Sequence, residues 1–142
     1  MPRLDVRLRG WAFILLAYAN AVASFARVGL VLTDAHEKRL NRAIEAMLGY
    51  SAQELARMSP LDYTHADDVA LDDRLHAESM AGWRDRYQIE KRYTRQDGRL
   101  MWGRLTHNLV RDAKGEPLLH FSILEDITGQ KLAQQALEQS YQ

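Results

Sequence analysis

The 142-residue sequence contains no cysteine. This absence excludes disulfides, thiolate nucleophiles, thiolate metal sites and photochemistry in which a cysteine adds to a chromophore. It fits a reducing compartment, and we expect a cytoplasmic location. The chain also lacks net charge, because 19 Lys and Arg balance 19 Asp and Glu. A neutral chain gives no indication of a nucleic-acid partner, and we expect none.

Residues 10–26, "GWAFILLAYANAVASFA", carry no charge and follow a stretch with several arginines. A secretory signal is one interpretation, with "ANA" or "AVA" as the cleavage site. A membrane span is less well supported, because the run is short and contains Asn20 and Ser24. We favour an amphipathic docking helix over residues 1–27, because apolar residues recur there at helical spacing. These residues are Trp11, Ile14, Leu15, Tyr18, Val22 and Phe25.

Periodicity and turn signals in the rest of the chain predict a single α+β domain with helices against one sheet face. After residue 82 the spacing of apolar residues changes from helical to alternating, which is typical of strands. The expected elements are a strand over 29–34, helices over 40–48, from 51 and over 66–82, strands over 86–93, 99–110 and 117–126, and a helix from 128.

Several polar residues stand where helix caps are expected. Ser51 and Glu54 have the spacing of a capping box. Thr64 with Asp67 offers a cap for the long helix, and Thr128 offers one for the last helix. These caps predict where three helices begin.

The motifs resemble, in order, those of PAS (Per-Arnt-Sim) sensor domains with a C-terminal PAC motif. They are "TD" at the end of the first strand, "NRAIEAMLGYSAQEL", "THADD", "YQIEKRYTRQDGRLMW", "LVRDAKGEP" and "EDIT". The resemblance implies a PAS/PAC domain over 28–128, flanked by the 1–27 helix and by an exit helix over 129–142. One departure is "AHEKRL", which stands where the family has a Gly-containing turn and a second strand. We expect that strand to be shortened or lost.

Resemblance to ligand-binding PAS sheets implies that one sheet face forms a pocket with the helices. The pocket candidates are Met47, His76, Ile89, Tyr93, Leu105, His107, His120, Ser122 and Leu124, and Met101 and Gly103 face the same way. The hairpin "EKRYTRQDGRLMW" at 90–102 would be the sheet wall. We expect its charges to be solvated or paired at the edges, where each contributes little.

Strand alternation directs a second set of side chains away from the pocket. These are Trp102, Thr106, Leu119, Phe121 and Ile123. The set is too apolar for a solvated face, so the N-terminal helix of the same chain or of a partner chain is expected to cover it. We therefore expect a homodimer, with Trp102, Phe121 and Ile123 near its interface.

Three histidines are candidate ligands. His107 and His120 are expected directly opposite each other, with Cβ atoms about 5 Å apart. Paired imidazoles can bind a metal, but without a third ligand they are more often hydrogen-bonded pocket walls, so no metal is assigned. His76 lies on the helix that carries the iron ligand in haem-binding PAS relatives, yet an exposed helix histidine is the simpler interpretation. Haem is not expected, and the cofactor is left unknown.

The resemblance implies a sensor, not an enzyme. "EDIT" resembles the PAC end, where the last strand passes into an effector-bound helix, and Asp126 and Thr128 mark this signal exit. A small ligand or partner would bias a histidine kinase or diguanylate cyclase domain, without membrane contact by the PAS core. The alternative is a ligand-free dimerisation module whose pocket is filled by its own side chains. A small enzyme using Asp67, Asp68 or His107 as base has no supporting spacing.

Overall fold

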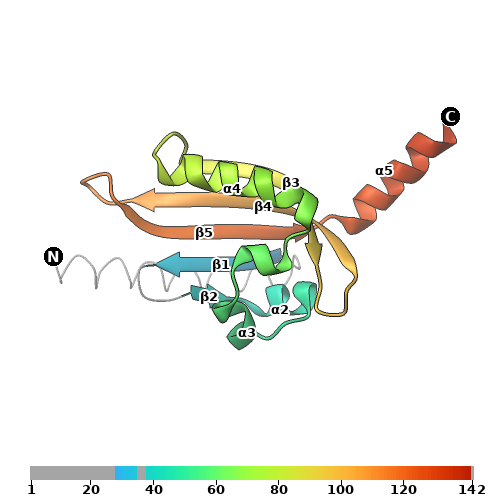
Figure 1. Ribbon diagram of the computed structural model, residues 1–142, viewed down its shortest axis with the longest axis horizontal. Coiled ribbons are helices and arrows are strands. Elements are labelled where there is room, and N and C mark those ends of the chain that lie inside the picture. The colour runs from blue at the N-terminus through green and yellow to red at the C-terminus, as the bar shows by residue number, and fades with distance from the viewer. Residues whose placement is uncertain (1–27, 35–37, 142) are drawn as a thin grey trace.

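The computed structural model describes residues 28–34 and 38–141 of the chain. Their core is a five-stranded antiparallel sheet with strand order β2-β1-β5-β4-β3 (Figure 1). The strands are β1 (Val28–Asp34), β2 (Lys38–Leu40), β3 (Arg86–Thr94), β4 (Leu100–Arg111) and β5 (Pro117–Asp126). The helices are α2 (Arg42–Leu48), α3 (Ala52–Arg57), the 3-10 helix η1 (Pro60–Tyr63), α4 (Ala66–Met80) and α5 (Thr128–Ser140). The expected α+β class is confirmed. The predicted N-terminal stripe from Trp11 to Phe25 lies outside the described residues.

The second strand is shortened but still forms. β2 has three residues and pairs antiparallel with β1, with Val31 opposite Leu40. Asn41 follows directly, and its buried side chain joins β1 to α2. Its Oδ1 accepts from the backbone N–H of Leu30 at 2.9 Å and of Ile44 at 3.3 Å, and its Nδ2 donates to the Val28 carbonyl at 2.9 Å. One side chain therefore caps α2 and fixes its position on the sheet.

The capping box at the start of α3 is confirmed, because Ser51 and Glu54 exchange the expected hydrogen bonds. The expected cap of α4 was wrong. Thr64 Oγ1 instead donates to the Pro60 carbonyl at 2.7 Å, and His65 is the N-cap, whose Nδ1 accepts from the Asp67 N–H at 3.1 Å. Thr64 is occupied by the preceding turn, so the next residue caps the helix.

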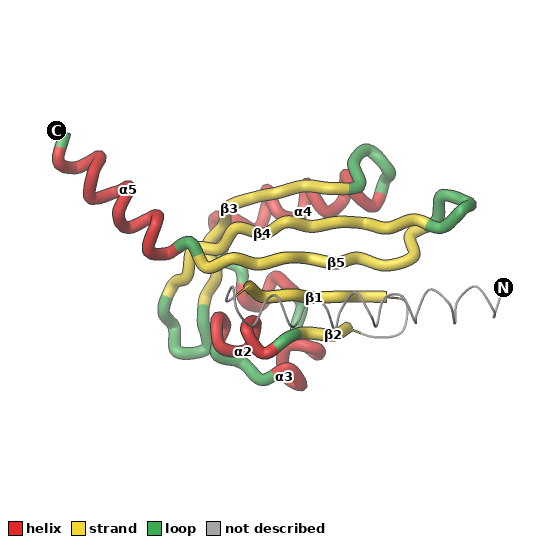
Figure 2. The backbone as a smooth tube through the Cα atoms, turned by 180° about the vertical axis from the view of Figure 1, so that it is seen from behind, coloured by secondary structure: helices red, strands yellow, loops and turns green. Residues whose placement is uncertain are grey.

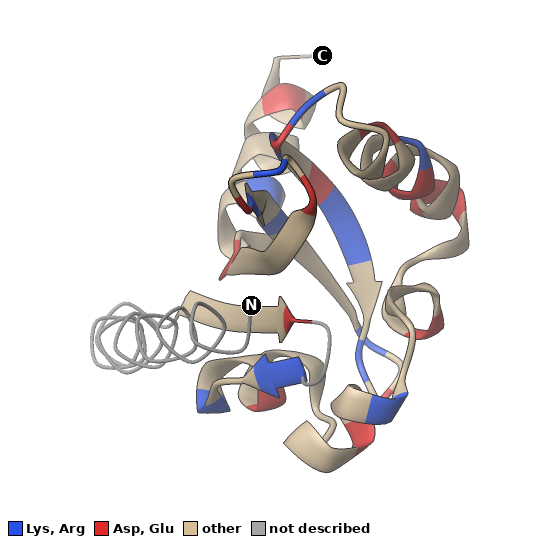
Figure 3. Cartoon of the chain, turned by 90° about the vertical axis from the view of Figure 1, so that its left-hand side faces the viewer, with Lys and Arg blue, Asp and Glu red and all other residues tan. Residues whose placement is uncertain are grey.

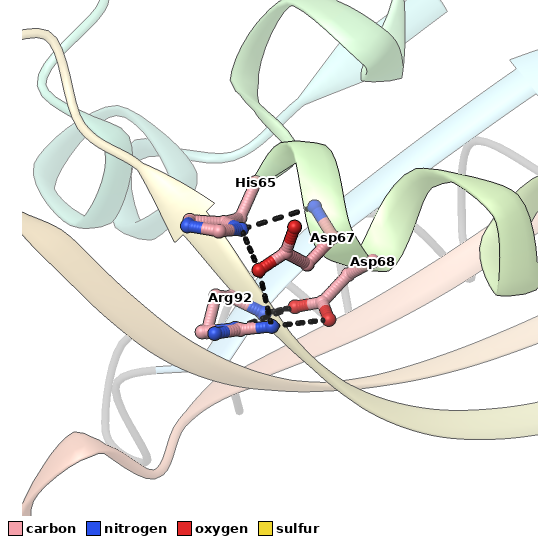
Figure 4. Close-up of polar contacts among 4 residues, drawn as sticks. All are labelled: His65, Asp67, Asp68 and Arg92. Carbon is pink, nitrogen blue, oxygen red and sulfur yellow. Dashed lines mark hydrogen bonds and ion pairs between the residues drawn. The ribbon is translucent and has the colours of Figure 1, made fainter.

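The first turn of α4 is also tied to the edge strand β3 (Figure 4). Asp68 accepts two hydrogen bonds from the Arg92 guanidinium, at 2.9 and 3.0 Å, and one from the Arg92 backbone N–H at 2.7 Å. These bonds hold the pKa of Asp68 below its ordinary value. His65 and Asp68 thus both have local roles at the start of the helix.

The main core lies between the sheet and the short helices. Ile44, Met47 and Leu48 of α2 pack there with Tyr93 and Met101 of the sheet. A second cluster lies under α4 and contains Leu75, Tyr87 and Ile89. Seen from the end of the sheet, helix α4 lies on one side of it (Figure 3). The helices thus cover the face that the pocket hypothesis requires.

Helix α5 leaves the sheet directly after β5 and projects away from the other elements (Figure 2). None of its described residues is buried, and Leu132, Leu137 and Tyr141 are exposed. The prediction that Thr128 caps this helix was wrong, because the helix has no side-chain cap and its N-cap position is Ile127. Thr128 Oγ1 accepts instead from the Trp102 N–H at 3.0 Å, so the sheet takes the atom that a cap would use.

Candidate functional site

A cavity of about 490 Å³ lies between the sheet and the helices. Strands β1 and β2 and the segment from α2 to η1 contribute mainly apolar side chains, whereas α4, β3, β4 and β5 contribute most of the polar ones. The cavity is lined by Val31, Thr33, Lys38, Leu40, Ile44, Leu48, Ser59, Pro60, Leu61, Tyr63, Asp72, Asp73, His76, Tyr87, Lys91, Tyr93, Leu105, His107, His120, Ser122 and Leu124. Its volume is in the range of small-molecule sites.

Most of the pocket candidates line this cavity: His76, Tyr93, Leu105, His107, His120, Ser122 and Leu124. Met47 and Ile89 do not. Met47 belongs to the main core cluster, and Ile89 packs with Leu75 and Tyr87 under α4. Met47 of α2 and Ile89 of β3 are both buried between the sheet and the helices, but neither lines the cavity.

The most polar feature of the cavity is a buried ion pair that the sequence reasoning missed. Lys91 is 2% exposed, and its Nζ lies 2.5 Å from Asp72 Oδ2 and 3.0 Å from Thr64 Oγ1. Burial lowers the pKa of Lys91, and the neighbouring Asp72 carboxylate opposes this effect. The expectation that the hairpin charges lie at the edges was therefore wrong for Lys91. Alternation from Ile89 to Tyr93 would have placed it inward.

Three imidazoles gather at the polar end of the cavity. The ring centroids of His107 and His120 are 5.3 Å apart, and that of His76 lies 5.7 Å from the first and 6.0 Å from the second. His120 Nδ1 is 3.3 Å from His107 Nε2, and His107 Nδ1 is 3.1 Å from Ser122 Oγ. Burial, followed by the two other histidines, lowers the pKa of His107 from 6.5 to about 4. His107 is thus neutral at pH 7.

The expected pairing of these histidines was wrong by two positions. His120 lies opposite Leu109, and His107 lies opposite Ser122, so the two imidazoles are diagonal neighbours. The β4–β5 register shifts after Val110, and the turn is closed by a bond from Asp112 N to Glu116 O at 2.9 Å. A six-residue turn without the irregularity would have given the direct pairing.

Two further properties concern metals and membranes. Among residues 28–34 and 38–141, no group of three His, Asp or Glu side chains is placed so that it could hold a metal ion. No helix in the described part of the chain combines the length and apolar character needed to cross a bilayer.

The junction between β5 and α5 is bonded to β4. Ile127 N donates to the Trp102 carbonyl at 2.9 Å, while Trp102 N donates to Thr128 Oγ1. Asp126 Oδ1 accepts from the Thr128 N–H at 3.0 Å, which places a negative charge at the positive end of the helix. Lys131 Nζ lies 4.9 Å from the centre of the Trp102 ring. The exit helix is therefore anchored by its first turn alone.

The face of the sheet opposite the cavity carries the residues that alternation placed there. Trp102 pairs across the strands with Arg92, whose guanidinium lies 5.4 Å from the indole ring. Phe121 and Ile123 are half-buried on β5, between His120, Ser122 and Leu124, which line the cavity. The proposed cover of this face, the N-terminal helix, is outside the described residues.

Comparison with known proteins identifies the family. The family model described as the PAS fold matches residues 37–120. The chain is 30% identical over 124 residues to the probable diguanylate cyclase DgcE of Escherichia coli, covering 86% of this chain and 11% of that protein. It is 29% identical over 126 residues to the sensor histidine kinase TmoS of Ectopseudomonas mendocina, covering 87% of this chain and 13% of that protein.

The fold also matches a solved structure. The crystal structure of a sensory box histidine kinase/response regulator from Burkholderia thailandensis aligns with a TM-score of 0.70 at 24% identity, covering 85% of this chain and 92% of that one. The chain spans only about a tenth of the length of the curated relatives, so the similarity concerns one module of each. The family-model match extends over more than half of the chain, and with the observed fold it shows that the chain belongs to the PAS family.

Proposed function

We propose that this chain is the sensory module of a larger signalling protein and is not itself an enzyme. In this proposal a small ligand in the cavity changes the output of an effector domain of the histidine kinase or diguanylate cyclase type. The names of the two curated relatives support these effector classes. We further propose a cytoplasmic location and a homodimer, for which the exposed Leu132, Leu137 and Tyr141 on α5 offer a seam.

The convergence of polar groups on the cavity supports ligand binding. Lys91, Asp72 and Ser122 face the same space as the histidines, and apolar side chains of β1 and α2 form the opposite wall. A few placed polar groups in a mostly apolar cavity are typical of ligand sites. A dimerisation module with a pocket filled by its own side chains has no need of this arrangement. We therefore favour sensing over the ligand-free alternative.

Strand β5 runs from the cavity to the start of α5, and this course supports the proposed relay of a signal from ligand to exit helix. His120 and Ser122 line the cavity on this strand, and the same strand reaches α5 a few residues later. Trp102 of β4 is bonded to both Ile127 and Thr128 at that point. A shift of β5 against β4 on ligand binding would therefore change the orientation of the exit helix.

The experiment is a phase test in the full-length parent protein. Inserting one residue after Tyr141 rotates whatever follows by about 100°, whereas inserting seven restores the heptad register. We expect the single insertion to disrupt control of effector output and the seven-residue insertion to retain it, at matched expression. Equal output from the two insertions would show that α5 is only a tether. Mass spectrometry of the denatured protein would identify a retained small molecule.

A further inference from the structure

Three buried tyrosines, Tyr63, Tyr87 and Tyr93, line the cavity. We propose that the cavity binds an uncharged, mainly apolar organic molecule through an oxygen atom that accepts hydrogen bonds from these tyrosine hydroxyls. This inference rests on the proposed function, because it names the chemical class of ligand for the same cavity. It is carried by the tyrosines themselves, by the balance of charge around them and by the apolar surface of the cavity.

The three tyrosines are almost fully buried, yet their hydroxyls are not paired. Tyr63, Tyr87 and Tyr93 are 8%, 6% and 2% exposed. In the part of the chain that the structure describes, none of their hydroxyls has a hydrogen-bond partner, and none is completely enclosed. Because each tyrosine lines the cavity, we place the accessible hydroxyl surface there. A buried tyrosine hydroxyl usually has a hydrogen-bond partner, and an oxygen atom of the ligand would supply it.

The formal charges along the cavity balance. Lys91 is paired with Asp72, and the other charged residues in the lining are one cation, Lys38, and one anion, Asp73. A charged ligand would lose its hydration in this cavity without meeting an excess of opposite charge. Such a loss is costly unless the charge is paired, so the lining favours an uncharged molecule.

The tyrosines are uncharged at pH 7 and are therefore hydrogen-bond donors. Burial, followed by the Asp72 carboxylate, raises the pKa of Tyr63 to about 12 and also raises the pKa of Tyr87 and Tyr93. The same carboxylate acts on all three, so an anionic ligand that accepted from these hydroxyls would be repelled by Asp72. A carbonyl, ether or hydroxyl oxygen can accept the same hydrogen bonds without this repulsion.

The remainder of the cavity sets the size and apolar character of the ligand. Most of the surface that the cavity exposes is apolar, and its lining includes Val31, Leu40, Leu105 and Leu124. Its volume of about 490 Å³ corresponds to about 16 groups of the size of a water molecule, at about 30 Å³ each. Two fused six-membered rings with a small substituent are within this limit.

Four naphthalene derivatives with equal numbers of non-hydrogen atoms serve as probes. 2-Acetylnaphthalene carries an uncharged acceptor oxygen, naphthalene-2-carboxylate is an anion, 1-(2-naphthyl)ethylammonium is a cation, and 2-isopropylnaphthalene has no hydrogen-bonding group. Equilibrium dialysis against the native chain at neutral pH measures the affinity of each probe. We expect saturable binding of one ketone molecule per chain, about ten-fold or more tighter than binding of either ion.

Tyrosine-to-phenylalanine variants test the hydroxyls directly. The triple variant Tyr63→Phe, Tyr87→Phe, Tyr93→Phe keeps the three rings, so the hydrocarbon probe should bind it as it binds the native chain. The ketone should bind about 2- to 12-fold more weakly, which is the range for one neutral hydrogen bond. Tyr141→Phe, at an exposed position on α5, is the matched control and should leave ketone affinity unchanged. If the triple variant fails to bind the hydrocarbon, the three single variants provide the same comparison.

The proposal is overturned if the ketone shows no saturable binding, if either ion binds more tightly than the ketone, or if removal of the hydroxyls leaves ketone affinity unchanged. The dialysis uses the chain alone and requires no effector output. A chain that prefers an ion can still pass the insertion test, and a chain that binds the ketone can fail it. The ligand class and the proposed relay are therefore refuted by different results.

Discussion

The buried Lys91–Asp72 pair allows a quantitative test of how the cavity contributes to stability. Lys91 is 2% exposed, and its ammonium has two oxygen partners, Asp72 at 2.5 Å and Thr64 at 3.0 Å. Replacing Lys91 by methionine keeps an unbranched side chain that is one atom shorter, and it leaves the Asp72 carboxylate without its cation. Replacing Asp72 by asparagine leaves the ammonium uncompensated.

The expected magnitude follows from burial. Removing one partner of a buried ion pair costs about 3–5 kcal/mol, because the remaining charge stays poorly solvated. Asp72 keeps 14% of its side-chain surface, so water partly relieves it, and we expect about 3 kcal/mol for Lys91→Met. Asp72→Asn should cost at least as much. The double variant has no isolated charge and should cost no more than either single one, which gives a coupling energy of about 3 kcal/mol.

Urea unfolding of the four proteins, monitored by circular dichroism, measures this double-mutant cycle. The matched control is the Glu90–Arg104 pair between β3 and β4, whose charged groups are 3.3 Å apart but partly exposed. Its coupling should stay below about 1 kcal/mol. If the Lys91–Asp72 cycle gives additive losses, the pair does not compensate its own burial, and the reasoning fails.

Three further outcomes are expected. Asn41→Ala leaves three backbone groups of β1 and α2 without a side-chain partner, and urea unfolding should show a loss of about 2–4 kcal/mol; Asn41→Asp, which keeps only the acceptor bonds, should lose less. His107 binds a proton below pH 6.5 when unfolded but only below about 4 when folded, so the free energy of unfolding should fall by about 3 kcal/mol as the pH drops across that interval. His107→Asn should reduce this slope, and equal slopes would contradict the assignment. Gly103→Ala should lower the melting temperature, because a Cβ there would lie 2.5 Å from Tyr93 and 2.7 Å from Leu124; an unchanged value would show that the two side chains move aside freely.

Strand alternation predicted the sheet well, because each strand has one face against the helices. Leu105 and His107 on β4, and His120 and Ser122 on β5, line the cavity as the pattern required. The sheet face on which a side chain lies depends only on its position along its own strand, and not on the turn between strands. Register does depend on that turn. The loop over 112–116 is one residue shorter than expected and the register shifts by one more after Val110, so the histidines lie diagonally and not opposite each other.

The ion pair was missed for a different reason. Lys91 lies on the same face of β3 as the buried Ile89 and Tyr93. A lysine in a strand is ordinarily solvated, however, and burying its charge is costly without a partner of opposite charge. That partner, Asp72, lies on α4, and its placement depends on how the helix packs across β3. Sequence periodicity describes each element alone and contains no information about such contacts between elements.

The two wrong cap predictions have a similar cause, because the partner of a capping side chain depends on contacts outside its own helix. Thr64 and Thr128 have the residue type of a cap, but their hydroxyls bond to the Pro60 carbonyl and the Trp102 N–H. A threonine side chain has one oxygen, and the surrounding backbone decides which group it serves. Ile89 follows the alternation of its strand and Met47 lies on the apolar face of α2, but only packing decides which inward side chains reach the cavity.

Because α5 is bonded to the sheet only at its first turn, we expect the helix to be more ordered at its start than at its end. The Ile127 and Trp102 amides are bonded within the sheet junction and should exchange hydrogen with the slow amides of the strands. Beyond them α5 has 13 residues and no buried side chain, a length at which an isolated helix is marginal in water. We therefore expect its outer turns to fray and re-form independently of the domain. A partner helix laid along Leu132 and Leu137 would complete the folding of α5, so its order beyond the first turn would depend on whether that partner is present.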